Sequence, residues 1–172
     1  LAPARDRAGA DPLETGVAAA ADTAVGDADV QEPPVPDEPV WKVVVDPGHG
    51  GDDPGATGAS GRVEKDFTLQ LSLEVMKLLE QEPNIEVKLT RVDDAFLSSV
   101  EYERAQFANA LEADLFVSIH GNTYEDPDVS GTETYYYDEP SLALASALHR
   151  HVVAATGFRD RGVRRANYFV LR

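Results

Sequence analysis

The chain of 172 residues contains no cysteine. Disulfide bridges, a thiolate nucleophile and cysteine-ligated zinc are therefore excluded, and any bound metal must be held by histidine and carboxylate side chains. With only four histidines present, each one becomes a candidate ligand. The sequence also has no run of about 18 apolar residues, so no membrane span is predicted.

Positive charge is scarce as well. The chain has 15 lysines and arginines against 31 acidic residues, which gives a formal net charge of −16. Nucleic-acid binding depends on cationic side chains that displace the counterions of the phosphate backbone. The charge balance therefore argues against a nucleic-acid partner.

The composition changes near residue 41. Residues 1–40 contain six of the eleven prolines, no aromatic residue, and nine acidic residues against two arginines. Low hydrophobicity with high net charge predicts a disordered acidic linker rich in alanine and proline. Residues 41–172 have a normal single-domain length and are predicted to form the folded part. An acidic linker in a cysteine-free chain is compatible with a secreted bacterial protein.

Apolar patterns in the folded part predict strands and helices in alternation. The predicted strands are 42–46, 85–90, 115–119, 132–137 and 168–171, and the predicted helices are 64–82, 99–112 and 142–155. This order is typical of an α/β fold with a mostly parallel twisted sheet and helices on both faces. The first helix is expected to bury the apolar positions Phe67, Leu71, Val75, Leu78 and Leu79.

Two histidines follow predicted strands. His49 comes three residues beyond the strand that begins the domain, and His120 directly follows residues 115–119. If both strands are parallel, both imidazoles emerge at the carboxyl edge of the sheet, where sites in such folds lie. Glu64, which begins the first helix, is the carboxylate at the same edge. Two histidines and one glutamate form a common ligand set of catalytic zinc.

Plainer interpretations remain open for each residue alone. A histidine at a strand end is often only hydrogen-bonded, and an acid at a helix start is favoured by the helix dipole. His149 and His151, on the helix predicted over 142–155, are expected to be surface or packing residues. The glycine-rich loop after the first strand lacks the lysine of a phosphate-binding loop.

The combination of motifs resembles the zinc-dependent N-acetylmuramoyl-L-alanine amidases of the amidase-3 type. The motifs are VVVDPGHGG over 43–51, EKD over 64–66, ADLFVSIHGN over 113–122 and GTETYYY over 131–137. The resemblance covers residues 41–172. It implies that His49, Glu64 and His120 hold one Zn²⁺ per chain, and that peptidoglycan is cut between N-acetylmuramic acid and L-alanine. It further implies a monomeric protein secreted to the bacterial cell wall or periplasm.

Two candidates for orienting the imidazoles lie close to the histidines in sequence. Asp46 precedes His49 by three residues, and Asn122 follows His120 by two. A histidine that binds a metal usually gives its other ring nitrogen to a carboxylate or carbonyl group. We therefore expect Asp46 and Asn122 to hold the two rings.

The general base of the expected reaction is missing from this sequence. In the family, a second glutamate has that role, on a strand that follows a segment like 168–172. No residue here matches that glutamate, its strand or the closing helix, so the expected glutamate would lie beyond Arg172 and the family's domain would be C-terminally incomplete. We therefore expect this chain to bind zinc but to hydrolyse slowly or not at all, and to expose an unpaired sheet edge.

Two alternative functions remain open. A non-catalytic cell-wall-binding or regulatory domain would keep the amidase fold without the base. Another zinc hydrolase, such as a carboxypeptidase or a deacetylase, would use the same three ligands on a different bond. The products distinguish these enzymes. A carboxypeptidase releases D-alanine and a deacetylase releases acetate, whereas an amidase frees the amino terminus of L-alanine.

Overall fold

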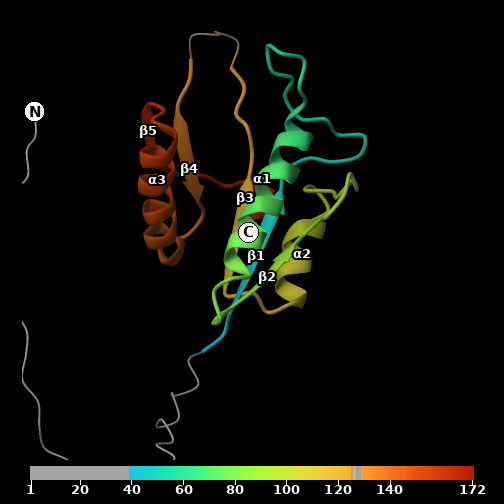
Figure 1. Cartoon of the computed structure of the whole chain (residues 1–172), viewed down its shortest axis with the longest axis vertical. Coiled ribbons are helices and arrows are strands. Elements are labelled where there is room, and N and C mark those ends of the chain that lie inside the picture. Colours follow the sequence, from blue (N-terminus) through green and yellow to red (C-terminus); the bar gives the residue numbers. More distant parts are fainter. Residues whose placement is uncertain (1–38, 125, 127–128) are drawn as a thin grey trace, which may run out of the picture. The chain divides into compact units, whose positions relative to one another are not determined.

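The structure is a computed structural model that describes residues 39–124, 126 and 129–172. The predicted linker over 1–40 lies outside the described residues, apart from its last two. The strands of the described part belong to two sheets, one of three strands and one of two (Figure 1). Every pairing between named strands is parallel.

The three-stranded sheet has the order β2-β1-β3. Its central strand β1 spans Trp41–Pro47 and pairs with β2, Ile85–Leu89, on one side and β3, Leu115–Ile119, on the other. Helix α1, Glu64–Leu79, connects β1 to β2, and helix α2, Glu103–Ala110, connects β2 to β3. The strands of this sheet therefore match the predicted ones to within two residues.

Helices cover both faces of this sheet because successive side chains of a strand point to opposite sides. Val43 and Val45 of β1 are buried with residues of β2 on the face that α1 covers. Lys42 and Asp46 point to the other face, where they bond Leu111, which follows α2, and Arg104 of α2. The predicted α/β class with helices on both faces is confirmed.

The predicted buried face of α1 is wrong in its rotation. Phe67, Leu71 and Leu78 are exposed, whereas Thr68 and Ser72 are fully buried. Val75 and Leu79 do pack against the core, as predicted, together with Leu73 and Met76. The helical period is correct, but in the first half of α1 the buried positions are 68 and 72, one residue after the predicted positions 67 and 71. Small polar side chains at the start of the helix allow it to approach the end of β1, where the Thr68 hydroxyl donates to the Gly48 carbonyl.

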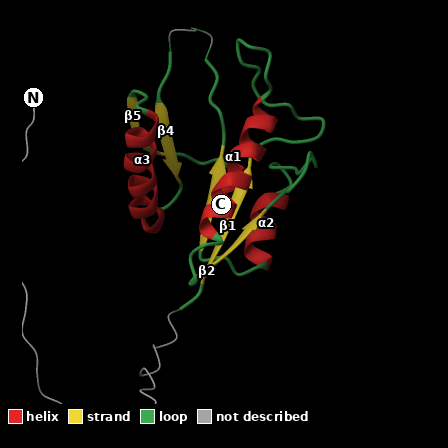
Figure 2. Ribbon diagram, in the orientation of Figure 1, coloured by secondary structure: helices red, strands yellow, loops and turns green. Residues whose placement is uncertain are grey.

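The second sheet consists of β4, Thr132–Tyr136, and β5, Asp160–Arg165. Helix α3, Leu142–Thr156, connects them and packs on β4 (Figure 2). Strand β5 was not predicted, since its charged sequence shows no apolar alternation. Two 3₁₀ turns complete the described elements, η1 over Glu139–Ser141 and η2 over Phe169–Leu171.

Two local predictions need correction. The segment 168–171 was predicted as a strand, but it forms η2 instead. The helix predicted over 99–112 is shorter, because Tyr102 has a left-handed conformation with φ of 60° directly before α2. No helix in the described part of the chain is long and apolar enough to cross a lipid bilayer.

The core and the corrected helix face can be tested with one pair of leucines. We expect Leu89→Ala, in the buried core, to lower the free energy of unfolding by about 3 kcal/mol, because it removes packed methylene groups and leaves a cavity. Leu78→Ala, on the exposed side of α1, should change it by less than about 0.5 kcal/mol. Urea unfolding of both variants measures the difference, and equal losses would contradict the rotation of α1 described above.

Candidate metal centre

Strand register brings the two predicted histidines to one edge. Pro47 at the end of β1 pairs with Ile119 at the end of β3, and His49 and His120 follow these partners closely. The His120 ring lies against Gly48, where a Cβ atom would overlap the imidazole. Glycine at this position is therefore a requirement of the close approach between the loop and the ring.

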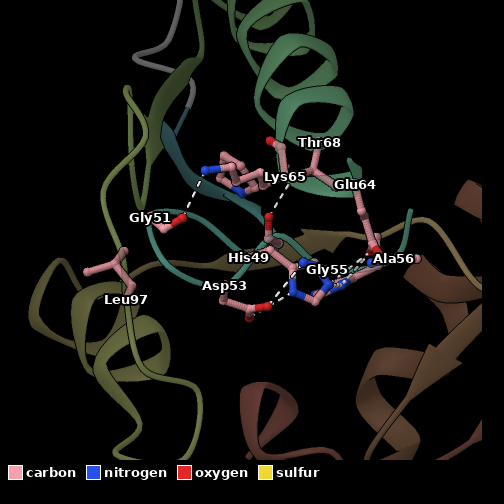
Figure 3. A network of polar contacts seen from close by, with 12 residues as sticks. His49, Gly51, Asp53, Gly55, Ala56, Glu64, Lys65, Thr68 and Leu97 are labelled. Atoms are coloured by element: carbon pink, nitrogen blue, oxygen red, sulfur yellow. Dashed lines mark hydrogen bonds and ion pairs between the residues drawn. The ribbon is translucent and has the colours of Figure 1, made fainter. Parts of the chain in front are cut away.

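Glu64 reaches the same edge from the first residue of α1. Its side chain is only 6% exposed, and both oxygens accept backbone hydrogen bonds. Oε1 accepts from the Gly121 amide at 2.7 Å, and Oε2 accepts from the Ala56 amide at 2.9 Å. Gly55, whose φ is +66°, leaves room beside both Glu64 and the His49 ring (Figure 3). The carboxylate is thus held in one orientation by the loop that precedes the helix and by the residue that follows His120.

The three side chains converge on one point. His49 Nε2 lies 3.1 Å from Glu64 Oε1, and His120 Nδ1 lies 3.1 Å from each of these two atoms. The three residues differ in exposure. The His120 side chain is 41% exposed, whereas Glu64 is buried. One nitrogen or oxygen of each residue therefore forms a compact, nearly equilateral triangle that is open on the His120 side.

The electrostatics favour an ionised Glu64. Burial alone would raise the pKa of this carboxyl, but hydrogen bonds from His120 and from the backbone amides of Ala56 and Gly121 outweigh that effect and bring the pKa to about 2. The carboxylate is therefore negatively charged at neutral pH. A negative oxygen beside two imidazole nitrogens is an arrangement suited to a cation.

Asp53 contacts His49 from behind, as the sticks of Figure 3 show. Its Oδ2 lies 2.8 Å from Nδ1 of the imidazole. Burial would raise the pKa of Asp53, but the hydrogen bonds with His49 and the Gly55 amide, together with electrostatic attraction to His49 and Arg104, outweigh it, so the net shift is downward. A carboxylate on Nδ1 leaves Nε2 of the same ring free to face the cluster.

The structure places the two predicted orienting residues differently. The Asp46 carboxylate bonds Arg104, Thr90 and Ser118, and the Asn122 amide donates to Glu133 at 2.9 Å. Neither has a hydrogen bond to an imidazole of the cluster. Asp53 was not predicted from the sequence, although its position four residues after His49 in a glycine-rich loop is a signal that could have identified it.

The C-terminal segment lies against α2 and adds no group to the cluster. Arg172 directly follows η2, and its guanidinium carbon lies 4.6 Å from the ring centroid of Phe169 and 5.8 Å from that of Tyr102. Arg172 is therefore an exposed residue whose guanidinium contacts these two rings, and it is not part of the candidate centre. Among the described residues none is assigned as general base, and a catalytic glutamate beyond Arg172 stays a prediction.

The remaining histidines lie on α3, away from this cluster. His149 is buried, as a packing residue would be, with Nδ1 3.1 Å from Thr134 Oγ1 and Nε2 2.7 Å from Asp160 Oδ1. It joins α3 to β4 and β5. His151 is exposed on the same helix. Both positions agree with the prediction that these two are surface or packing residues.

Glu133 of β4 is the centre of a second polar network. Its side chain is 8% exposed and accepts from the Tyr135 hydroxyl at 2.6 Å and from Arg161 Nε at 2.9 Å. Arg164 lies 3.3 Å away. Hydrogen bonds from Tyr135 and Arg161 hold the pKa of Glu133 below its usual value, and the bond to Glu133 raises the pKa of Tyr135 to about 12.

A parallel sheet with flanking helices, and a His-Glu-His cluster at its carboxyl edge, define the molecule as an α/β protein with a candidate three-ligand metal centre. The particular family follows from comparison with known proteins. Residues 43–172 match the family described as N-acetylmuramoyl-L-alanine amidase, and the chain belongs to this family.

Several relatives are similar over most of the chain. The sporulation-specific N-acetylmuramoyl-L-alanine amidase of Bacillus subtilis is 40% identical over 135 residues, which cover 76% of this chain and 51% of that protein. A probable cell wall amidase of Staphylococcus aureus, LytH, is 35% identical over 132 residues, which cover 76% of this chain and 43% of that protein. The chain spans about half the length of the curated relatives that it matches.

Solved structures agree with the family and the fold. The catalytic domain of the N-acetylmuramoyl-L-alanine amidase CwlV from Bacillus (Paenibacillus) polymyxa var. colistinus superposes with a TM-score of 0.74 at 44% identity, covering 77% of this chain and 74% of that one. An N-acetylmuramoyl-L-alanine amidase from Clostridium difficile gives 0.73 at 34% identity, with 78% and 74% covered.

The Glu133 network predicts a pH-dependent stability. Because the folded pKa of Glu133 lies below its unfolded value, its contribution is complete above the unfolded pKa and is lost as the pH falls through the folded pKa. We expect Glu133→Gln to lower the free energy of unfolding by about 2 kcal/mol near neutral pH. The difference from the wild type should shrink when the pH is lowered from 7 to a value below the ordinary glutamate pKa of about 4.3, because the wild-type carboxyl then also begins to lose its charge.

Urea unfolding at both pH values measures this effect. Glu82→Gln, at an exposed position, is the control and should match the wild type. A Glu133→Gln difference that grows on acidification would contradict the assigned direction of the pKa shift.

Proposed function

We propose that this protein is a zinc-dependent peptidoglycan hydrolase that cleaves the amide between N-acetylmuramic acid and L-alanine. The observation that carries the proposal is the triangle of ligand atoms from His49, Glu64 and His120, each 3.1 Å from the other two. Membership of the amidase family supports the choice of bond. The names of relatives that act on the cell wall support a location in the cell envelope, either the cell wall or the periplasm.

The residues present fit a zinc ion. Tetrahedral zinc with bonds of about 2.0–2.1 Å to nitrogen and oxygen separates neighbouring ligands by about 3.3 Å, close to the observed spacing. Two neutral imidazoles and one carboxylate are the donor types that catalytic zinc takes. A carboxylate behind a ligating histidine, as Asp53 stands behind His49, is the usual outer partner of such a ligand.

Each of these residues has a definite task in amide hydrolysis. When bound by these three residues, zinc would polarise the substrate carbonyl and lower the pKa of a water molecule. Glu64 is already ionised at neutral pH, because its pKa is about 2. Asp53 keeps the His49 proton on Nδ1, so that Nε2 retains its lone pair. The partial exposure of His120 leaves one side of the cluster accessible to a polymeric substrate such as peptidoglycan.

Metal content tests the ligand assignment directly. We expect the purified chain to bind one zinc per monomer, and His49→Ala and His120→Ala to abolish stoichiometric zinc because each removes one of three ligands. His151→Ala changes an exposed histidine on α3 and should leave the metal content unchanged. Elemental analysis after dialysis measures the stoichiometry. Retention of one zinc per chain in both ligand variants would overturn the assignment.

Product analysis tests the reaction. Purified peptidoglycan is incubated with the 172-residue chain and, where the gene encodes more, with its full product, and new amino termini are labelled. We expect the full product to free L-alanine amino termini in a chelator-sensitive manner, and the 172-residue chain to do so slowly, since no described residue is assigned as general base. Release of D-alanine or acetate instead would indicate a carboxypeptidase or a deacetylase. Sedimentation with peptidoglycan without any product would favour the non-catalytic wall-binding domain.

A further inference from the structure

Two buried arginines lie directly beneath the loop that carries His49. Arg91 follows β2 and Arg104 belongs to α2, and they are 3% and 2% exposed. The loop between β1 and α1 passes over both guanidinium groups. The proposed reaction does not use either of them, and their contacts therefore need a separate explanation.

Arg104 joins the end of β1 to the backbone of the ligand itself. Its Nη1 donates to Asp46 Oδ1 at 2.6 Å and to the Pro47 carbonyl at 2.8 Å, and its Nη2 donates to the His49 carbonyl at 2.8 Å. The guanidinium is planar, so these directions are fixed relative to one another. Arg104 therefore links the His49 backbone directly to helix α2.

Arg91 completes the set from the other side. Its Nε donates to the Pro47 carbonyl at 3.1 Å, and its Nη2 donates to the Gly48 carbonyl at 2.9 Å. The Thr68 hydroxyl also donates to the Gly48 carbonyl, at 2.7 Å. Three consecutive carbonyls, of residues 47, 48 and 49, thus accept hydrogen bonds from buried side chains.

This arrangement holds a conformation that the chain would otherwise avoid. His49 has a φ of 62°, in the left-handed region that is unfavourable for residues other than glycine. Such a conformation persists when the surroundings over-determine it. With the carbonyls directed at the two cations, the imidazole of His49 projects toward Glu64 and His120.

We propose that Arg91 and Arg104 are positioning residues that hold the His49 backbone in its metal-binding conformation. Arg104 forms an ion pair with the buried carboxylate of Asp46, whereas the hydrogen bonds of Arg91 go to backbone carbonyls and the Thr68 hydroxyl. Burial of the second cation, Arg91, is energetically costly, and the ion pair between Asp46 and Arg104 does not explain why Arg91 is buried. The metal-affinity part of this inference rests on the proposed function, whereas the conformation of the loop can be measured without metal.

The test uses substitutions that keep the charge or the shape. Arg104→Lys and Arg91→Lys retain a cation but lose the planar set of donors, and Thr68→Val removes one hydroxyl from the Gly48 carbonyl. Arg159→Lys, at an exposed arginine, is the matched control. Zinc affinity is measured by competition with a chelator. Hydrogen exchange of the Gly50 amide, which donates to the Asp53 carbonyl, is followed in the metal-free proteins.

We expect both lysine variants to bind zinc about ten-fold more weakly or worse, in line with the loss of outer partners at metal sites. Gly50 exchange should accelerate in the same variants, while Arg159→Lys matches the wild type in both measurements. A purely structural role would lower the melting temperature but leave the zinc affinity of the folded protein unchanged, and that result overturns the inference.

The two proposals fail in different ways. A wild-type chain that binds no zinc contradicts the proposed function, and unchanged Gly50 exchange in the metal-free variants then overturns the positioning role as well. If Arg104→Lys does not fold, Thr68→Val applies the same test with a smaller perturbation, and an unaltered zinc affinity together with unaltered exchange in this variant counts against the inference.

Discussion

The Asp46 carboxylate at the end of β1 is the interaction on which the rest of the structure depends. It is completely buried, and a buried charge is tolerated only when it is paired and hydrogen-bonded. Arg104 of α2 provides the paired charge, Ser118 of β3 donates at 2.6 Å, and Thr90, just beyond β2, also donates. One side chain thus connects all three strands of the first sheet and one of its helices at the carboxyl edge, where the candidate metal centre lies.

From this edge the candidate centre is built largely by the backbone. The Glu64 carboxylate accepts hydrogen bonds from the amides of Ala56 and Gly121, and the carbonyls of residues 47–49 accept them from Arg91 and Arg104. Glycines 48 and 55 leave the room that the two imidazoles occupy. Because each ligand is held by a different segment, their 3.1 Å spacing reflects the packing of the whole sheet rather than any local motif.

Several features were predictable from local patterns alone. The valine run of β1 and the apolar run of β3 indicated strands because β-branched and aromatic side chains favour a buried sheet. Parallel pairing then brought His49 and His120 to one edge, as expected. Strand β5 was not predicted, because its charged sequence has no strand pattern and its strand structure depends on pairing with β4. The buried face of α1 was predicted incorrectly, because Thr68 and Ser72 pack where apolar residues were expected.

The sequence by itself determined the α/β class, the family resemblance and the three candidate ligands, since these depend on residue type, order and spacing. Only the tertiary structure decided which groups support those ligands. Asp53 rather than Asp46 contacts His49, and Asp46 is committed to Arg104. Such choices depend on side-chain directions after the strands, helices and loops have packed, and a linear pattern of residues does not contain those directions.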